Sequence, residues 1–202
     1  MTVRKGQPWG EAGPLPDNGV VVRSDAEAGA VLEDARRRRM PYPPLGLLAG
    51  DLCRTLGGVG DEARLRSSDA VRFPVDLGEA WVDGELRLFV AHLVAHSRTW
   101  RRSLVVMNAQ WRGSWNLGPR AHPNDGLLDT YDARLGFRDL ALVRPRLHHG
   151  AHLPHPAIVE RRASTAQVDL GRRLAVELDG RPGGRGRVVS VRVEPDALVV
   201  VV

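Results

Sequence analysis

The sequence is short of several residue types and segments, and each shortage excludes a class of protein. A single cysteine, Cys53, leaves no intrachain disulfide possible, which fits a reducing cytoplasm. No apolar run approaches the length of about eighteen residues that a membrane-spanning helix needs. The N-terminal stretch MTVRKGQPWGEAGPLPDNG lacks the apolar core of a secretory signal. These absences predict a cytoplasmic protein of 202 residues with an ordinary buried core.

Lysine and aromatic residues are also scarce. Lys5 is the only lysine, so every other basic side chain is an arginine and the net charge is +5. So extreme a ratio indicates a GC-rich coding bias rather than a surface selected to bind phosphate. Arginines gather at residues 36–39 and at 181, 185 and 187, where they could meet anionic lipid headgroups at the inner membrane face or form solvated ends. Aromatics make up 5% and form no ladder among the arginines, so nucleic acid is not an expected partner.

The first sixty residues read as one β-α-β unit. GVVV at residues 19–22 is typical of a short buried strand, and a helix is expected over 24–39 because a capping Ser24 or Asp25 precedes early acids and late arginines. LGLLAG at 45–50 predicts a second strand, and the short helix that follows opens at Asp51. A strand–helix–strand order at this spacing favours a parallel pair.

After residue 60 the pattern changes to many short strands separated by Gly, Pro and Asp. Asp83-Gly84 predicts a hairpin turn, and further strands are expected around residues 103–111, 127–135, 164–170, 173–183, 187–194 and 196–202. We therefore predict an α+β fold, with a small α/β unit over residues 1–60 followed by an antiparallel β-sandwich over residues 61–202.

The stretch NAQWRGSWNLGPRAHPNDGLLD, residues 108–129, carries glycines and prolines that fix an irregular path. Its carboxylates, Asp125 and Asp129, could turn toward one point with a backbone carbonyl between them. Oxygen ligands of this kind suit a hard cation such as Mg²⁺ or Ca²⁺. From the residues alone, a tight turn with a capping aspartate is an equally good interpretation.

A sequence of motifs then points to a family. The patterns MNA…G…P.A.PNDGLLD, G.HLPHP.I, LDG and V.V.PDALVVVV follow one another in an order that resembles the C-terminal β-rich domain of the diacylglycerol kinase and sphingosine kinase family. The resemblance covers roughly residues 61–202. It implies that residues 108–129 form a rigid connection between strands and that Asp125 helps to hold a structural metal ion. With the two carboxylates noted above, we expect Asp125 and Asp129 to be the ligands and Mg²⁺ to be a possible ion.

The resemblance extends into the first sixty residues in eroded form. The family carries Gly-Gly-Asp-Gly-Thr, whose glycines let backbone amides approach nucleotide phosphates. Asp25 matches its aspartate, but Arg23, Ser24, Ala26 and Glu27 replace the other residues. Only about twenty residues precede this point, so roughly the first half of a nucleotide domain is expected to be missing.

Two further family motifs are kept in part. PLGLLAGDLCRTLGG resembles Gly-Thr-Gly-Asn-Asp-Phe-Ala-Arg-Ser-Leu-Gly and keeps Asp51 and Arg54, so the resemblance implies nucleotide contacts at Gly50, Asp51 and Arg54. The family's Asp-Gly-Glu, whose glutamate is regarded as the catalytic base, reads here Asp179-Gly180-Arg181. A guanidinium cannot accept the proton of a substrate hydroxyl, so the role of base is vacant.

Other chemistry-bearing residues have simpler interpretations. His148, His149, His152 and His155 invite a zinc site, but the family pattern places a structural loop there. RPGGRGR at 181–187 could clasp a phosphate or end a hairpin. Cys53 lacks a histidine partner and is expected to be a buried thiol. The five tryptophans are expected in the core or at the sandwich edge, with one or two lining a lipid pocket.

Two functions follow from the sequence. The first is a divergent, non-catalytic or very weakly active member of the lipid kinase family that recognises a lipid, a nucleotide-like ligand or another protein. The second is an active ATP-dependent lipid kinase, completed by a partner chain, with Asp25 and Asp51 around Mg²⁺-ATP and Asp179 as substitute base. ATP is an expected ligand only under the second interpretation.

Overall fold

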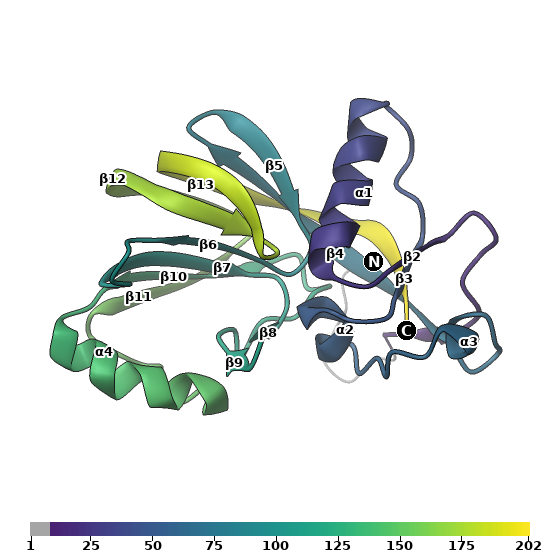
Figure 1. Ribbon diagram of the computed structural model, residues 1–202, viewed down its shortest axis with the longest axis horizontal. Helices are drawn as coiled ribbons and strands as arrows, with labels where there is room; N and C mark the ends of the chain where they lie inside the picture. Colours follow the sequence, from purple (N-terminus) through teal and green to yellow (C-terminus); the bar gives the residue numbers. More distant parts are fainter. Residues whose placement is uncertain (1–8) are drawn as a thin grey trace.

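The computed structural model describes residues 9–202, and its first elements form a small unit of helices around parallel strands (Figure 1). These elements are β1 (Glu11–Ala12), β2 (Val20–Val22), α1 (Asp25–Arg37), β3 (Leu45–Leu47), α2 (Asp51–Thr55) and α3 (Glu62–Leu65). β2 pairs in parallel with β3, which confirms the parallel pair expected from the sequence.

Helix α1 forms where its local signals place it. The Ser24 side chain caps the helix by accepting a hydrogen bond from the Glu27 backbone N–H at 3.1 Å. Ala28, Leu32 and Ala35 recur on one face and are buried, as an amphipathic helix requires.

The rest of the chain is mainly antiparallel strands. They are β4 (Val71–Val82), β5 (Glu85–Phe89), β6 (His92–His96), β7 (Arg102–Met107), β8 (Trp111–Arg112), β9 (Trp115–Asn116), β10 (Leu128–Arg134), β11 (Ile158–Ala163), β12 (Thr165–Leu178) and β13 (Arg181–Val201), with α4 (Phe137–Val143) and the 3-10 helix η1 (Arg144–His149) between β10 and β11. The main sheet runs in the order β1-β4-β13-β12-β6-β7-β10-β11, while β8 and β9 form a separate two-stranded ribbon.

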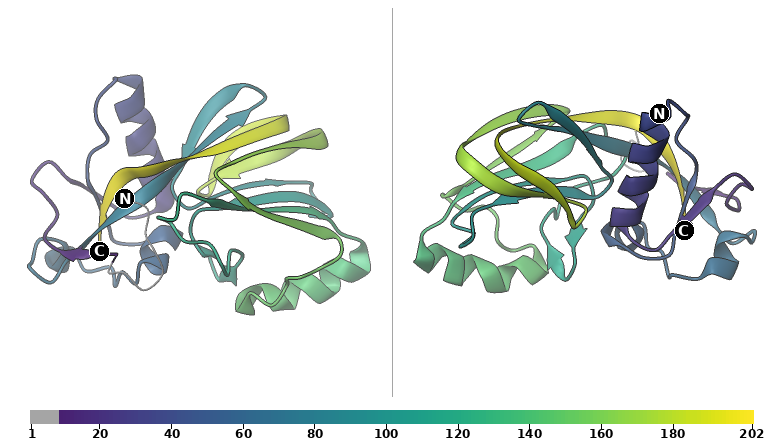
Figure 2. Two further views of the ribbon diagram at one scale, coloured as in Figure 1. Left: turned by 180° about the vertical axis from the view of Figure 1, so that it is seen from behind. Right: turned by 45° about the horizontal axis from the view of Figure 1, so that its top comes forward.

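The main sheet folds over itself, so that β5, β12 and β13 lie above β6, β7, β10 and β11 (Figures 1 and 2). Apolar side chains alternate along each strand toward the space between the two layers. Phe89, Leu93, Leu104, Val176 and Val189 are among the buried residues packed there. The expected α+β fold with a β-sandwich is therefore confirmed.

Two Asp-Gly pairs make the tight turns of the sandwich. Asp83 and Gly84 have φ of 49° and 90°, and Asp179 and Gly180 have φ of 52° and 77°. Positive φ at both positions is what two-residue hairpin turns need. The hairpin expected at Asp83-Gly84 is confirmed, with β4 and β5 on either side.

The strand breaks expected in the last forty residues are wrong. The predicted strands at 164–170 and 173–183 lie largely in one strand, β12, with an irregularity near Gly171, and those at 187–194 and 196–202 lie largely in β13. Glycine and aspartate there bend continuous strands instead of ending them. Helices α4 and η1 were not anticipated, because FRDLALVRPRLHH has too short an apolar pattern to separate helix from strand.

The two parts of the chain share a core. One buried cluster joins Leu32 of α1 and Leu45 of β3 to Val75 of β4 and to Leu198 and Val200 of β13. The end of β13 also pairs in parallel with β3. The division of the chain into two domains near residue 60 remains a prediction. In the folded protein, β4 and β13 run from the sandwich into the N-terminal unit (Figure 1). No helix among residues 9–202 is long and apolar enough to cross a membrane.

Candidate functional site

Asp25 begins α1, and its carboxylate meets the first turn of α2. Its Oδ2 accepts a hydrogen bond from the Asp51 backbone N–H at 2.5 Å, and its Oδ1 accepts one from the Leu52 N–H at 3.2 Å. Gly50 stands just before them with φ of 113°, and a Cβ there would lie 2.6 Å from Asp25 Oδ1. Glycine is required at this position both by the backbone conformation and by the close approach of the carboxylate.

The side chain of Asp51 faces the sandwich. Its Oδ2 lies 3.0 Å from His92 Nε2, and its Oδ1 accepts a hydrogen bond from the Gly113 backbone N–H at 2.8 Å. His92 is a buried residue of β6 that the sequence analysis missed. Its one sequence signal is a polar residue inside the apolar run LFVAHLVAH, which does not reveal its partner.

Asp179 lies at the turn between β12 and β13 and is buried. Its carboxylate accepts hydrogen bonds from three consecutive backbone N–H groups, those of Val90 at 2.8 Å, Ala91 at 2.9 Å and His92 at 3.0 Å. Such a set of donors fixes the carboxylate in place. The structure thus brings Asp25, Asp51 and Asp179 to one junction between the N-terminal unit and the sandwich.

The groups at this junction shift one another's pKa values. Burial, and next the charge of Asp179, raise the pKa of Asp25 to about 7. Burial also raises the pKa of Asp179, although His92 and the three N–H donors oppose it. For Asp51 and His92, burial favours the neutral forms, but their shared hydrogen bond outweighs it, so the pKa of Asp51 is lowered and that of His92 is raised. Opposite shifts of this kind indicate an ion pair between an imidazolium and a carboxylate.

The Arg181 guanidinium is held by contacts with α1 and β5. Its Nη1 pairs with Glu33 Oε2 of α1 at 3.2 Å, and its Nη2 donates to the Leu88 carbonyl of β5 at 3.1 Å. A Cβ at Gly29 would stand 2.2 Å from Arg181 Nη2, so the guanidinium packs directly on the α1 backbone. Arg181 therefore joins α1 to the sandwich.

Arg54 is likewise held by the protein itself. Its Nη1 donates to the Gly113 carbonyl at 2.8 Å, and its guanidinium lies 3.5 Å from the centre of the Trp111 ring. The nucleotide contacts implied for Gly50, Asp51 and Arg54 remain predictions. The structure places all three at the start of α2, against the β8–β9 ribbon.

The predicted metal ligands lie side by side around an arginine. Arg162 pairs with Asp125 Oδ2, and its Nε lies 3.5 Å from Asp129 Oδ1. Both carboxylate oxygens of the buried Asp129 lack a hydrogen-bond partner among residues 9–202. Their lone pairs are therefore available to coordinate a hard cation. Among residues 9–202 no group of three or more His, Cys, Asp or Glu side chains is placed to hold a metal. These two carboxylates fit Mg²⁺ only if Arg162 withdraws, and the structural metal ion stays a prediction.

The four histidines do not converge in the described part of the chain. His148 Nδ1 is 3.2 Å from the Ser114 carbonyl, while His155 Nδ1 accepts from the Ala157 backbone N–H at 3.1 Å. His152 is buried beside Tyr131. These separate partners favour the structural-loop interpretation over a zinc site.

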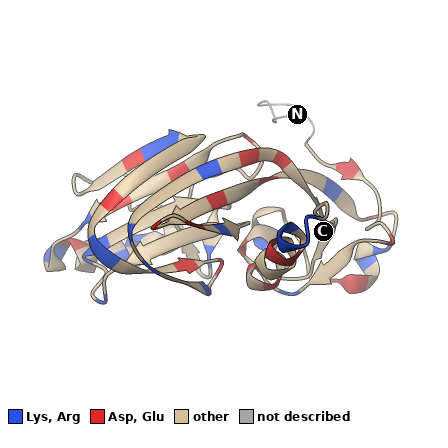
Figure 3. Ribbon diagram, turned by 90° about the horizontal axis from the view of Figure 1, so that it is seen from above, with Lys and Arg blue, Asp and Glu red and all other residues tan. Residues whose placement is uncertain are grey.

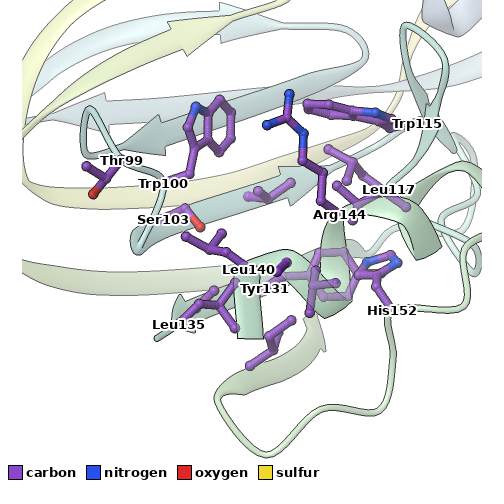
Figure 4. Close-up of a pocket in the computed structure, with 16 residues that line it drawn as sticks. Thr99, Trp100, Ser103, Trp115, Leu117, Tyr131, Leu135, Leu140, Arg144 and His152 are labelled. Carbon is purple, nitrogen blue, oxygen red and sulfur yellow. The ribbon is translucent and has the colours of Figure 1, made fainter. Parts of the chain in front are cut away.

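A second feature is an apolar cavity of about 330 Å³ beneath α4 and η1. Val105, Tyr131 and Ala133 of β7 and β10 line one side of it, and Leu140 and Leu147 line the other. Figure 4 shows Arg144 reaching between Trp100 and Trp115 at one side of the cavity. The hydroxyl of Tyr131 is buried without a hydrogen-bond partner.

This cavity has the character of a ligand site. Its size falls at the small end of small-molecule pockets, and its apolar walls with few polar groups are typical of them. Its mouth combines a cation with two aromatic rings, so an amphiphile with an anionic head fits its chemistry. Trp100 and Trp115 line this cavity, and a lipid as its occupant remains a prediction.

Comparisons with known proteins agree with this architecture. Residues 71–202 match the family described as the YegS C-terminal NAD kinase beta sandwich-like domain. Two solved structures of a candidate diacylglycerol kinase from Bacillus anthracis str. Sterne are similar, with TM-scores of 0.65 and 0.67 at 14% and 12% identity, each covering 91% of this chain and 77% of the other. A crystal structure of a diacylglycerol kinase from the same organism gives 0.59 at 14% identity, with 91% and 75% covered.

No curated protein sequence matches the chain significantly. The identities to the solved structures are low, so these structures show a shared fold. The resemblance read from the motifs over residues 61–202 is confirmed by the family match.

Proposed function

Because the chain belongs to the YegS C-terminal NAD kinase beta sandwich-like family and shares the fold of diacylglycerol kinases, we propose that it is a lipid-binding protein with little or no kinase activity. The main support for weak or absent kinase activity is the set of contacts that Arg181 makes with its own chain. The resemblance assigns the catalytic base to this position, and here a cation stands there, bound to Glu33 and to the Leu88 carbonyl. It can neither accept a proton nor swing away without breaking the contact between α1 and β5.

The amides that would meet phosphate are also in use. The N–H groups of Asp51 and Leu52 at the start of α2 both donate to the carboxylate of Asp25. A phosphate placed there would compete with a carboxylate of the same chain and be repelled by its charge. In place of flexible glycines, Ser24 and Glu27 close the first turn of α1 through their own hydrogen bonds. These contacts support the absence of nucleotide binding.

Asp179 is a poor substitute for the missing base. All three backbone donors around it bind its charged form, and it is shut away from solvent. A general base must lie within hydrogen-bond reach of the substrate proton. Its contacts support a structural role at the β12–β13 turn.

The binding half of the proposal rests on the cavity beneath α4. An acyl chain suits the apolar walls at Val105, Ala133 and Leu140, and an anionic or zwitterionic head suits Arg144. Each methylene removed from water contributes about 0.8 kcal/mol. A cavity of about 330 Å³ holds part of one chain, so affinity should rise with chain length and then level off.

A second function is favoured by one observation. Asp25, Asp51 and Asp179 lie at one junction, with His92 as a further titratable group, and this is the convergence that an active ATP-dependent lipid kinase would need. Under this alternative a partner chain would complete the nucleotide domain and displace Asp25 from the α2 amides.

A phosphotransfer assay separates the two functions. The purified chain is incubated with Mg²⁺ and radiolabelled ATP in the presence of diacylglycerol, sphingosine or phosphatidylglycerol. We expect no transfer above background, since loss of a base costs about 10²–10⁴-fold and loss of oriented phosphate donors costs about 10²–10³-fold more. Transfer by the wild type that Asp51→Ala abolishes would establish the kinase function instead.

The binding half has its own test. Calorimetry with lysophosphatidic acids of increasing chain length, each below its micelle concentration, should show affinity rising about fourfold per methylene before a plateau. Ala133→Phe, which fills the cavity, should abolish binding. Leu142→Phe is the matched control, because Leu142 is exposed on α4 and does not line the cavity. Equal binding by both variants would place the ligand elsewhere.

A further inference from the structure

One end of the sandwich carries a dense group of arginines. We define the arginine-rich end as Arg98, Arg101, Arg134, Arg172, Arg173 and Arg185. All six side chains are exposed. They come from the loop between β6 and β7, the end of β10, the irregular part of β12 and β13. Figure 3 shows blue segments gathered at the strand ends remote from the C-terminus.

Two shallow hollows show that these arginines form one continuous surface. The hollows measure about 470 and 490 Å³, and both include Thr99 and Arg172 in their walls. The apolar cavity beneath α4 adjoins the second hollow, because Thr99 and Leu135 line both. The arginine-rich end and the apolar cavity are therefore neighbours.

The charge of this surface is poorly compensated within the chain. Among residues 9–202, Arg98, Arg134 and Arg172 take part in no ion pair, and Arg173 pairs only with Asp83. By contrast, Arg36 pairs with Glu79, and Arg37 and Arg38 pair with Asp34. At the helix end at 36–39 only Arg39 has no ion pair among residues 9–202, whereas most arginines of the arginine-rich end, including Arg185 from the second cluster noted in the sequence, have none.

Exposed apolar residues adjoin these charges. Phe137 at the start of α4 is 68% exposed, with the Arg101 guanidinium 4.5 Å from its ring centre, and Leu142 is 57% exposed on the same helix. Arginines beside exposed aromatic and aliphatic groups are the composition that suits the headgroup region of an anionic bilayer.

We propose that the arginine-rich end, with Phe137, docks the protein on membranes that contain anionic lipids. In this orientation α4 and the mouth of the apolar cavity lie next to the bilayer, so that a lipid can enter the cavity without crossing water. The docking role rests on the proposed lipid-binding function, since a lipid site gains from direct access to its source. Arg144 at the mouth belongs to the same positively charged face.

Vesicle flotation tests this docking surface. Wild-type protein should float with phosphatidylcholine vesicles only when phosphatidylglycerol is included, and binding should fall steeply with salt because the Debye length is about 8 Å at physiological ionic strength. The triple variant Arg98→Gln, Arg134→Gln, Arg172→Gln should lose roughly 100-fold in partition coefficient, since each arginine near the surface contributes about fivefold.

The matched control removes the same charge elsewhere. The triple variant Arg37→Gln, Arg38→Gln, Arg39→Gln should bind within a few-fold of wild type. Phe137→Ser should weaken binding several-fold at low and at high salt alike, because its contribution is not electrostatic. Circular dichroism melts establish that each variant is folded; a variant that is not folded is replaced by single substitutions at Arg172 and Arg134, each expected to lose about fivefold.

Three outcomes would overturn the docking surface. They are equal losses in the two triple variants, binding of the wild type to neutral vesicles, and displacement of the wild type from vesicles by an oligonucleotide at physiological salt. The last would assign the surface to nucleic acid. The lysophosphatidic acid titration of Ala133→Phe is independent of vesicles. If the wild type floats with vesicles but binds no lysophosphatidic acid, the docking surface stands and lipid binding in the cavity is contradicted. If it binds lysophosphatidic acid but does not float, only the docking surface is contradicted.

Discussion

At the scale of single residues, Arg181 connects α1 to the sandwich. Its guanidinium sits between Glu33, the Leu88 carbonyl and the backbone at Gly29. A carboxylate at this position would face Glu33 as a like charge. The change that would restore the family's motif is therefore expected to damage the fold rather than revive chemistry.

We predict that Arg181→Glu lowers stability without producing activity. Breaking a partly buried ion pair and opposing Glu33 with a second carboxylate should cost about 2–4 kcal/mol. Chemical denaturation measures the loss. The double variant Arg181→Glu, Glu33→Arg should recover part of it, and lipid kinase activity in Arg181→Glu alone would show that the phosphate-binding loop is not needed.

Asp25 gives the junction a pH dependence. Burial and the charge of Asp179 raise its folded-state pKa to about 7, from 3.8 for an ordinary aspartate. The folded protein thus binds a proton more tightly than the unfolded chain across this window. The stabilising contribution is complete below the unfolded pKa and is lost as pH rises toward 7.

We therefore predict that the melting temperature of the wild type relative to Asp25→Asn falls as pH rises from about 4 to 7, then becomes constant. The change of this difference in melting temperature with pH reports the titration of Asp25, because an asparagine does not titrate. The hydrogen bonds lost in Asp25→Asn change the melting temperature equally at every pH. Melting curves across the pH range check it. A constant difference between the two proteins would mean that Asp25 titrates normally.

At the scale of elements, the connection from β9 to β10 combines the packing of Leu117 against Met107 and Tyr131 with polar contacts further along the connection. Asp125 and Asp129 both pair with Arg162 of β11, and neither buried oxygen of Asp129 has a hydrogen-bond partner among residues 9–202. A hard cation would satisfy those oxygens and tie the connection to β10. Arg162 competes for the same carboxylates.

We predict that excess chelator lowers the melting temperature of wild type by a few degrees relative to Mg²⁺, as loss of a bound ion should. Asp129→Asn should show no such difference. Arg162→Gln should enlarge the response, because it removes the competing cation. Melting curves that are identical in chelator and Mg²⁺ for both wild type and Arg162→Gln would leave the turn interpretation.

At the scale of the whole molecule, β4 and β13 join the two parts of the chain through one buried cluster. Leu198 and Val200 of β13 lie in the same buried cluster as Leu32 of α1 and Leu45 of β3. The last strand of the chain thus completes the core of the first elements. Because the two parts share this core, we expect the N-terminal unit to unfold together with the sandwich.

We predict a single unfolding transition for the whole chain. Leu198→Ala should cost about 2–5 kcal/mol, as for other buried leucines. It should lower the unfolding midpoint by the same amount whether unfolding is followed by far-ultraviolet circular dichroism, which reports the strands, or by tryptophan fluorescence. Two separated transitions, with only one moved by Leu198→Ala, would show that the boundary near residue 60 divides independent folding units.

Features that depend on near neighbours in the chain could be predicted from the sequence. The cap and charge order of α1, the Asp83-Gly84 turn and the alternation of the strands are local signals, so these elements and the α+β class were predictable. The presence of an arginine at position 181, where the resemblance implies a glutamate, could also be read directly, because it concerns which side chain is present.

Only the tertiary structure decided which distant groups meet. Asp51 and His92 are 41 residues apart, and Arg181 and Glu33 are 148 apart. No periodicity encodes such pairings, because they follow from how β4 and β13 carry the sandwich onto α1. The cavity beneath α4 and the arginine-rich end arise in the same way. They combine residues from several strands and loops, whose side chains share a surface only after the sheet has folded over itself.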